Sequence, residues 1–188
     1  MKNILIFGRP RCGKSTLANM IVDKFNYQVI HMDALRDTFK TIYPELNINP
    51  KEAKYNEKFQ LFLQEYLRRN TKEEERNKYG YVLEGCDISV SDCNKLYNNG
   101  KNIIYFLVPL EISAEEFFSN IRKNDSKYDW TYKYSNEQLI ETSKKYILEG
   151  KQIREECEKY NINCVDTSVN REQKLRIILE EIEQKIKS

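Results

Sequence analysis

The chain has 188 residues, with 31 lysines and arginines against 29 aspartates and glutamates, which gives a formal net charge of +2. This balance offers no electrostatic case for a nucleic acid or a membrane surface as the default partner. The length suits one domain, 1–188, with a substantial core. No signal peptide and no apolar run of membrane length stands out, so we expect a reducing cytoplasm as its location.

Cysteine and histidine usage argues against several kinds of site. The five cysteines include no C-x-x-C pair, and their odd number favours neither a disulfide framework nor a zinc site. Because His31 is the only histidine, a histidine-based metal site or a Ser-His-Asp triad is not expected either.

The first two predicted elements enclose a glycine-containing loop. A short apolar run over 2–7 is typical of a buried strand, and the apolar spacing within 17–25 predicts a helix. The residues between them are Gly8-Arg9-Pro10-Arg11-Cys12-Gly13-Lys14-Ser15-Thr16, which fit the phosphate-binding pattern G-x-x-x-x-G-K-[ST], also called Walker A.

The spacing of this loop suits a nucleoside triphosphate. Its glycines let backbone N–H groups approach phosphate oxygens, and the next helix points its positive end at them. Lys14 would lie between the β- and γ-phosphates, and the Ser15 hydroxyl would ligate Mg²⁺. The helix end would also favour the thiolate of Cys12, although we prefer to interpret Cys12 as an unreactive loop residue. We therefore expect ATP and Mg²⁺ as cofactors, bound by Gly8, Arg11, Cys12, Gly13, Lys14, Ser15 and Thr16.

Strand and helix patterns then alternate to the end of the chain. Strand patterns cover 27–32, 81–83, 103–108 and 162–165, and helix patterns cover 34–42, 52–70, 92–97, 113–121, 137–160 and 172–186. A polar bend is expected over 44–50, and the charge run 71–78 is interpreted as a solvated helix end or loop. Such alternation predicts an α/β fold with about five strands in a mainly parallel sheet flanked by helices.

With these elements the sequence resembles the nucleotide-kinase branch of the P-loop proteins, which includes adenylate kinase, shikimate kinase and related small-molecule kinases. The Gly8–Thr16 loop carries most of the resemblance, and Gly80-Tyr81-Val82-Leu83-Glu84-Gly85 is similar to the strand-Asp-Gly ending of adenylate-kinase-like enzymes. The resemblance implies a three-layer fold with a small helical lid. It also implies that Glu84 helps to hold the metal or to place the acceptor and that Gly85 lets the acceptor approach; a plain strand exit is the alternative.

The residues after the second strand resemble the acceptor-binding part of such kinases. The resemblance implies that Asp33 orients the acceptor hydroxyl or accepts its proton, and that Arg36 binds an anionic group of the acceptor. A positioned carboxylate and a planar guanidinium suit these two roles. Asp33 could instead simply cap the helix that follows it. The acceptor side of the site is expected over about 34–70.

The polar segment 122–135 lies where this branch places its mobile, arginine-bearing lid. The resemblance implies that Arg122 acts on the transferring phosphoryl group when the lid closes. This chain has Arg122-x-x-Asp125 where adenylate kinase lids carry Arg-x-Asp-Asp. The departure leaves the second arginine of the lid undefined, and Arg154 is a weaker candidate for it. A basic surface loop is the alternative interpretation.

Together these features predict an ATP-dependent phosphotransferase that acts on a small-molecule acceptor, with Lys14, Asp33 and Arg122 as the catalytic residues. Asp87 stands where adenylate kinase has the Pro-Arg that binds a monophosphate, so a nucleoside or another hydroxylated metabolite is as well supported as a nucleotide. An ATP-binding regulatory module or a slow ATPase without a small-molecule acceptor is the alternative. A kinase that acts on nucleic-acid ends is disfavoured, because the two basic segments, Arg68-Arg69 and 122–135, lie among acidic residues that reduce their positive charge.

Overall fold

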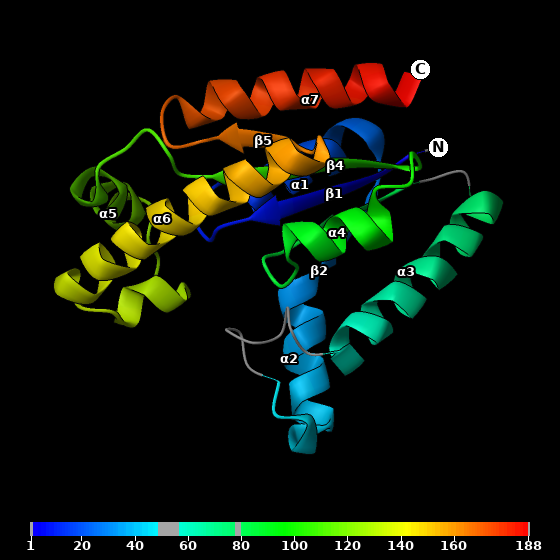
Figure 1. Ribbon diagram of the computed structural model, residues 1–188, viewed down its shortest axis with the longest axis horizontal. Helices are drawn as coiled ribbons and strands as arrows, with labels where there is room; N and C mark the ends of the chain where they lie inside the picture. Colours follow the sequence, from blue (N-terminus) through cyan, green and yellow to red (C-terminus); the bar gives the residue numbers. More distant parts are fainter. Residues whose placement is uncertain (1, 49–56, 78–79, 188) are drawn as a thin grey trace.

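The computed structural model describes residues 2–48, 57–77 and 80–187, and a parallel sheet of five strands lies at its centre. The strand order is β2-β3-β1-β4-β5, and each neighbouring pair is parallel. This confirms the α/β fold with a parallel sheet between layers of helices (Figure 1). The strands are β1 Asn3–Gly8, β2 Gln28–His31, β3 Tyr81–Glu84, β4 Asn102–Val108 and β5 Asn163–Asp166.

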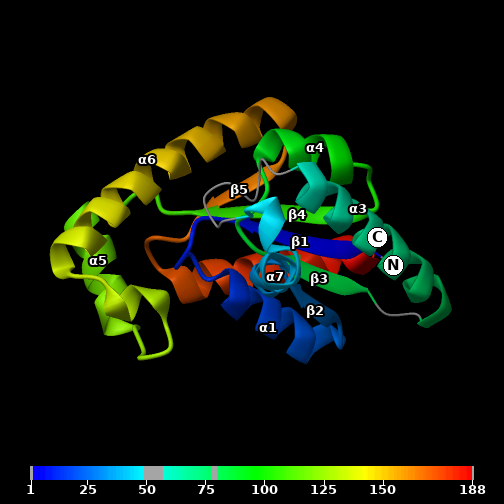
Figure 2. The same cartoon turned by 90° about the horizontal axis from the view of Figure 1, so that it is seen from below.

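Helices cover both faces of the sheet because alternate residues of a strand point to opposite faces. Leu5 and Phe7 of β1 belong to a buried cluster with residues of α3, α4 and α6, whereas Ile4 and Ile6 pack with α1 and α7. Figure 2 shows these two helical layers on either side of the sheet. The helices are α1 Lys14–Phe25, α2 Met32–Ile42, α3 Glu57–Asn77, α4 Val90–Tyr97, α5 Ala114–Lys123, α6 Asn136–Tyr160 and α7 Arg171–Lys187.

Serine caps set the starts of three helices. Ser89, Ser113 and Ser135 each accept a backbone N–H three residues on, before α4, α5 and α6 respectively. Such caps satisfy N–H groups that have no partner within the helix. The helix predicted over 92–97 therefore begins two residues earlier, at Val90.

Two predicted segments fall partly outside the described residues. The long helix predicted over 52–70 is described from Glu57 and continues to Asn77, so the charge run is a helix end as far as Asn77. Within the bend predicted over 44–50, Pro44–Leu46 forms a short 3₁₀ helix, η1, and 49–50 lie outside the described part. None of the described helices is both long enough and apolar enough to cross a membrane.

The sheet topology places the Gly8–Thr16 loop at a specific point. β1 lies between β3 and β4, and the chain builds the β2–β3 side before it crosses to the β4–β5 side. In an open α/β sheet, ligands bind outside the carboxyl ends of the strands, where the strand order reverses. The loop leaves β1 at this position, and the residues that follow the other strands share the same edge because all strands are parallel.

Asp166, at the carboxyl end of β5, ties this edge together. Its carboxylate accepts hydrogen bonds from the backbone N–H groups of Leu110 and Glu111 and from the Ser168 hydroxyl. Although burial opposes ionisation, the hydrogen bonds from Ser168 and Leu110 and the charge of Lys174 lower the pKa of Asp166. The carboxylate thus joins the loops after β4 and β5.

Asp166→Asn should lower the free energy of unfolding by about 1–3 kcal/mol at pH 7, because the amide cannot accept all of these bonds. The folded-state pKa lies below the unfolded value of about 3.9, so the stabilisation is present above about pH 4 and is lost as the pH falls through the folded value. Urea unfolding at pH 7 and at pH 3.5 measures the free energy of unfolding of both proteins, and their difference should be smaller at pH 3.5. A difference that is larger at pH 3.5 would contradict this role of Asp166.

Candidate active site

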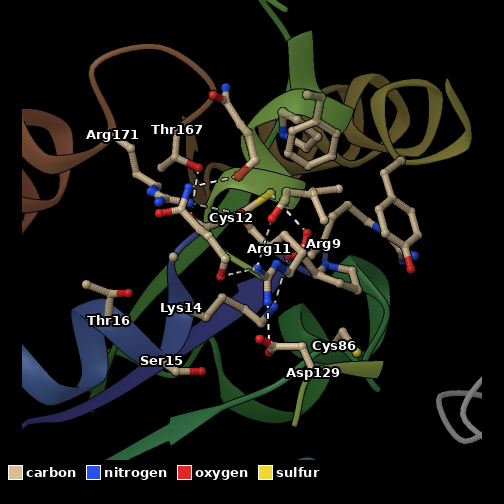
Figure 3. Close-up of a pocket in the computed structure, with 18 of the residues that line it drawn as sticks. Arg9, Arg11, Cys12, Lys14, Ser15, Thr16, Cys86, Asp129, Thr167 and Arg171 are labelled. Atoms are coloured by element: carbon tan, nitrogen blue, oxygen red, sulfur yellow. Dashed lines mark hydrogen bonds and ion pairs between the residues drawn. The ribbon is translucent and has the colours of Figure 1, made fainter. Parts of the chain in front are cut away.

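One cavity of about 1480 Å³ lies at the carboxyl edge of the sheet (Figure 3). Its lining includes Arg11, Cys12, Gly13, Lys14, Ser15 and Thr16 of the glycine-containing loop, together with Asp33, Arg36 and Glu84 from the neighbouring strand ends. The structure therefore brings together most of the residues that the sequence singled out. Segments separated by more than 60 residues in the chain meet here because their strands end at the same edge.

The loop conformation depends on its two glycines. Gly8 has a φ of 122°, and a Cβ atom there would lie 2.0 Å from the carbonyl oxygen of Leu107. Gly13 has a φ of 87° and forms the N-cap of α1. Glycine adopts such positive φ values without strain, and at Gly8 only glycine allows so close an approach of β1 to β4. The loop is thereby folded against β4, and its following helix begins at Lys14.

Lys14 is nearly buried, with 8% of its surface exposed. Its Nζ donates a hydrogen bond to the Arg9 carbonyl at 2.9 Å, which holds the ammonium group within the curve of the loop. The first N–H groups of α1 have no intrahelical partner and carry partial positive charge. An ammonium group beside a helix N-terminus is an arrangement that binds phosphate oxygens.

Cys12 does not have the activated thiol that a helix N-terminus alone would produce. The residue is 2% exposed, and burial raises the pKa of its thiol to about 11 despite the nearby charge of Lys14. The expectation that the helix end favours its thiolate is therefore wrong, because desolvation outweighs it. The Cys12 carbonyl accepts the Thr167 hydroxyl at 2.9 Å, which fixes the loop to the end of β5.

Asp33 does not cap α2. The N-cap is His31, and Asp33 lies in the first turn, so the capping alternative is wrong. Its carboxylate is 62% exposed, lines the cavity and bonds to Arg36 Nη1 at 3.1 Å. An exposed carboxylate that one guanidinium orients can still accept a proton or a hydroxyl hydrogen bond from a ligand.

Arg36 is surrounded by carboxylates. Its guanidinium pairs with Asp87 at 2.6 Å, Asp37 at 3.0 Å and Asp33 at 3.1 Å, and Asp87 is 1% exposed. Although burial opposes the charge, these carboxylates raise the pKa of Arg36. An anionic acceptor group would have to compete with all three for the guanidinium, so anion binding by Arg36 stays a prediction. The Asp87 pairing was not foreseen because the two residues are 51 positions apart.

Glu84 ends β3 beside the loop and is 8% exposed. Its Oε1 lies 2.7 Å from Nδ1 of His31, at the end of the adjacent strand. The next residue, Gly85, has no room for a side chain, because a Cβ atom would lie 2.6 Å from that of Met32. The sequence indicated a strand end for His31 but gave no sign of its contact with Glu84.

The donors expected for Mg²⁺ are of the right chemical kind. Ser15 is exposed at the start of α1, and Glu84 lines the same cavity; both offer the hard oxygen ligands that Mg²⁺ takes. Mg²⁺ needs only one or two protein ligands because substrate phosphates and waters complete its coordination. These residues therefore fit the ion.

Arg122 holds the segment 122–135 together from within. Its guanidinium donates to the carbonyls of Thr131 and Tyr134 and to the carboxylate of Asp125, and Nε reaches Asn136. Arg122 is not among the residues that line the cavity, and neither is Arg154 on α6. In this arrangement neither arginine faces a bound phosphate, and their roles in catalysis stay untested predictions.

Arg11, from the loop itself, is the arginine that contacts the lid segment. Nη1 bonds to Asp129 at 2.8 Å (Figure 3). Nη2 bonds to the Asn124 carbonyl at 2.8 Å and to the Ile121 carbonyl at 3.5 Å. The carbonyls at the end of α5 carry partial negative charge, which favours a guanidinium. Hydrogen bonds from Ser126 and the charge of Arg11 lower the pKa of Asp129 against its partial burial.

We expect Arg11→Ala to release the lid segment from the loop, because three hydrogen bonds and the ion pair with Asp125 are lost together. The free energy of unfolding should fall by about 1–3 kcal/mol. Hydrogen exchange of the backbone amides over 124–129 should rise, while Asp129→Asn, which keeps the two carbonyl contacts, should raise it less. Unchanged exchange in Arg11→Ala would show that the contact does not hold the segment.

Aromatic residues form another part of the cavity wall. Trp130 and Tyr134 pack edge to face with ring centres 5.1 Å apart, and both line the cavity, as does Tyr146 of α6. Sequence reasoning placed the first two in the lid but missed Tyr146 and its neighbour Glu149. Both lie within a long amphipathic helix, where nothing in the local sequence distinguishes a residue that lines a site from one on the helix surface.

No known protein-family profile matches the chain, and neither does any curated protein sequence. Solved structures do match. A shikimate kinase from Bacteroides thetaiotaomicron is 13% identical with a TM-score of 0.56, over 97% of this chain and 98% of that one. A sugar kinase from Janibacter sp. is 11% identical with a TM-score of 0.61, over 97% and 95%. A gluconokinase from Sinorhizobium meliloti is 16% identical with a TM-score of 0.55, over 93% and 87%.

These similarities extend over nearly the whole of each chain, and the matched structures share one fold. The protein therefore has the P-loop, nucleotide-kinase-like fold that the sequence resemblance implied. At such low identity the likeness shows the fold, and the activity has to be argued from this chain's own residues.

Proposed function

We propose that the protein is an ATP-dependent phosphotransferase that moves the γ-phosphate of Mg²⁺-ATP to a hydroxyl group of a small molecule. The observation that carries this proposal is the shared cavity. Its lining includes the nearly buried Lys14, the start of α1 and the carboxylates of Asp33 and Glu84. A phosphate-binding loop that shares a cavity with positioned carboxylates is what transfer to a hydroxyl requires.

The loop side would bind the nucleotide. The N–H groups at the start of α1 would contact phosphate oxygens, and Lys14 would exchange its bond to the Arg9 carbonyl for bonds to the β- and γ-phosphates. Ser15 and Glu84 would hold Mg²⁺, which neutralises developing charge on the phosphate oxygens when it is bound. The cavity is large enough for a nucleotide and a second small molecule together, because ligand pockets commonly measure about 300–1,000 Å³.

The acceptor would lie beside Asp33. In the transfer step the hydroxyl oxygen forms a bond to the γ-phosphorus, and the bond from that phosphorus to the bridging oxygen of ADP breaks. The hydroxyl proton passes to the Asp33 carboxylate and then to water. Asp33 thus orients the nucleophile, and Arg36 holds the carboxylate in place at 3.1 Å. The lid segment with Trp130 and Tyr134 would keep water from the phosphoryl group.

The proposal is tested by the release of ADP from Mg²⁺-ATP across a panel of nucleosides, nucleoside monophosphates and hydroxylated metabolites, with a reaction that lacks any acceptor as the reference. At least one acceptor class should raise ADP release well above that reference. If ATP binds and no acceptor changes its turnover, the protein is a regulatory ATP-binding module or a slow ATPase instead.

A further inference from the structure

We propose that Arg9, the second residue of the Gly8–Thr16 loop, supplies the guanidinium that contacts the γ-phosphate of bound ATP, and that Glu149 and Tyr146 of α6 position it. This inference rests on the proposed phosphotransferase function. It replaces a lid arginine with an arginine from the phosphate-binding loop itself.

The backbone of Arg9 is fixed next to Lys14. Its N–H donates to the Leu107 carbonyl of β4 at 3.0 Å, and its own carbonyl accepts the Lys14 ammonium at 2.9 Å. The backbone from which the Arg9 side chain extends is therefore held against the ammonium group that is expected to bind the β- and γ-phosphates. The Arg9 side chain lines the same cavity as Lys14.

The guanidinium of Arg9 is held by two residues of one helix. Nη2 pairs with the Glu149 carboxylate at 2.8 Å, and the group lies 4.6 Å from the centre of the Tyr146 ring. These residues lie three positions apart on α6, so they share one helix face. Their contacts orient a planar cation, while Nε of Arg9 is buried and makes no hydrogen bond among the described residues. A buried N–H donor without a partner is costly unless a ligand satisfies it.

Arg9, Tyr146 and Glu149 all line the cavity, and Figure 3 labels Arg9 next to Arg11 of the same loop. Cys86 belongs to the loop after β3, on the acceptor side. Burial raises the pKa of its thiol to about 11, and the charges of Lys14 and Arg9 both oppose that rise. Cys86, Lys14 and Arg9 line the same cavity, which is consistent with this influence of the two cations on the thiol.

Three of the other arginines at or near the cavity have several partners elsewhere. Arg122 and Arg11 donate to carbonyls and aspartates of the lid segment, and Arg36 is shared by three carboxylates. Arg9 has one carboxylate partner, Glu149, and its Nε donates to no described residue. Because a guanidinium can bind two phosphate oxygens at once, it can spread over the equatorial oxygens on which charge develops during transfer.

The test compares the affinities of Mg²⁺-ATP and Mg²⁺-ADP by calorimetry, since neither measurement needs an acceptor. Arg9→Ala should weaken ATP binding about ten- to one-hundredfold, as expected for a lost charge-assisted hydrogen bond, and should change ADP binding less than about threefold. Arg9→Lys should recover most of the ATP affinity but not kcat with the best acceptor. Glu149→Gln should lower kcat without weakening ATP binding, which separates positioning from binding.

Arg69→Ala is the matched control, because it removes an exposed arginine that pairs with Glu65 on α3, away from the cavity. Thermal unfolding of each variant confirms that it folds. Equal losses of ATP and ADP affinity in Arg9→Ala, or no loss of either, would overturn the role of Arg9 while leaving the phosphotransferase proposal intact. A folded wild-type protein that binds neither nucleotide would overturn both.

Discussion

Lys14→Ala should lower kcat/KM for phosphoryl transfer by at least about 10²- to 10³-fold. A loss of this size follows when an enzyme loses one hydrogen-bond donor that stabilises the negative charge of the transition state. The structure holds this ammonium group in a fixed position. Lys14 is 8% exposed, and its Nζ already lies inside the loop on the Arg9 carbonyl. Steady-state ADP release with the best acceptor measures the effect.

Lys24→Ala on the same helix is the control for this experiment, because Lys24 lies at the far end of α1 and pairs with Glu183 of α7. It should leave kcat/KM within about twofold, as surface changes far from a site usually do. A Lys14→Ala protein that folds and still transfers phosphate at the wild-type rate would remove the basis for placing the nucleotide in the Gly8–Thr16 loop.

Asp33→Asn should lower kcat by about 10²- to 10⁴-fold, the usual contribution of a positioned acid–base group. The affinity for ATP should hardly change, because Asp33 lies on the acceptor side of the cavity. The amide keeps the size of the side chain and can still accept a hydrogen bond from Arg36, but it cannot take up the hydroxyl proton. Rapid-quench measurements of a single turnover would show the loss directly.

Asp37→Asn offers a matched comparison. Asp37 has the same exposed side-chain fraction as Asp33, 62%, and it also pairs with Arg36, at 3.0 Å. If the two variants lose activity equally, the carboxylates act through Arg36 and Asp33 has no special role at the acceptor. A large loss for Asp33→Asn alone assigns the proton transfer to Asp33.

The strands and helices could be predicted because their signals are local. The apolar run of β1, the spacing of α1 and the glycines between them lie within the first 25 residues, and the resulting fold is confirmed by the structures of other kinases. The positions of Asp33 and Glu84 in the cavity also followed, since parallel strands end at one edge. Ser89 was missed as a cap, so α4 begins earlier than predicted.

The contacts between side chains could not be predicted, because they join residues far apart in the chain. Arg11 and Asp129 are separated by 118 positions, and nothing in either segment indicates that the loop holds the lid segment. Arg9 and Glu149 meet only because α6 crosses the carboxyl edge of the sheet (Figure 1). Arg122 was expected at the phosphate from its place in the chain, but its donors go to the lid segment's own carbonyls.

The central claim is that the γ-phosphate goes to an organic hydroxyl group, and labelled phosphate tests this most directly. The protein is incubated with ATP labelled at the γ-phosphate, Mg²⁺ and each acceptor of the panel, and the products are separated. We expect the label in a phosphate ester of one acceptor class, in an amount equal to the ADP formed. Label that appears only as inorganic phosphate, whatever acceptor is present, would contradict the claim and identify the protein as an ATPase.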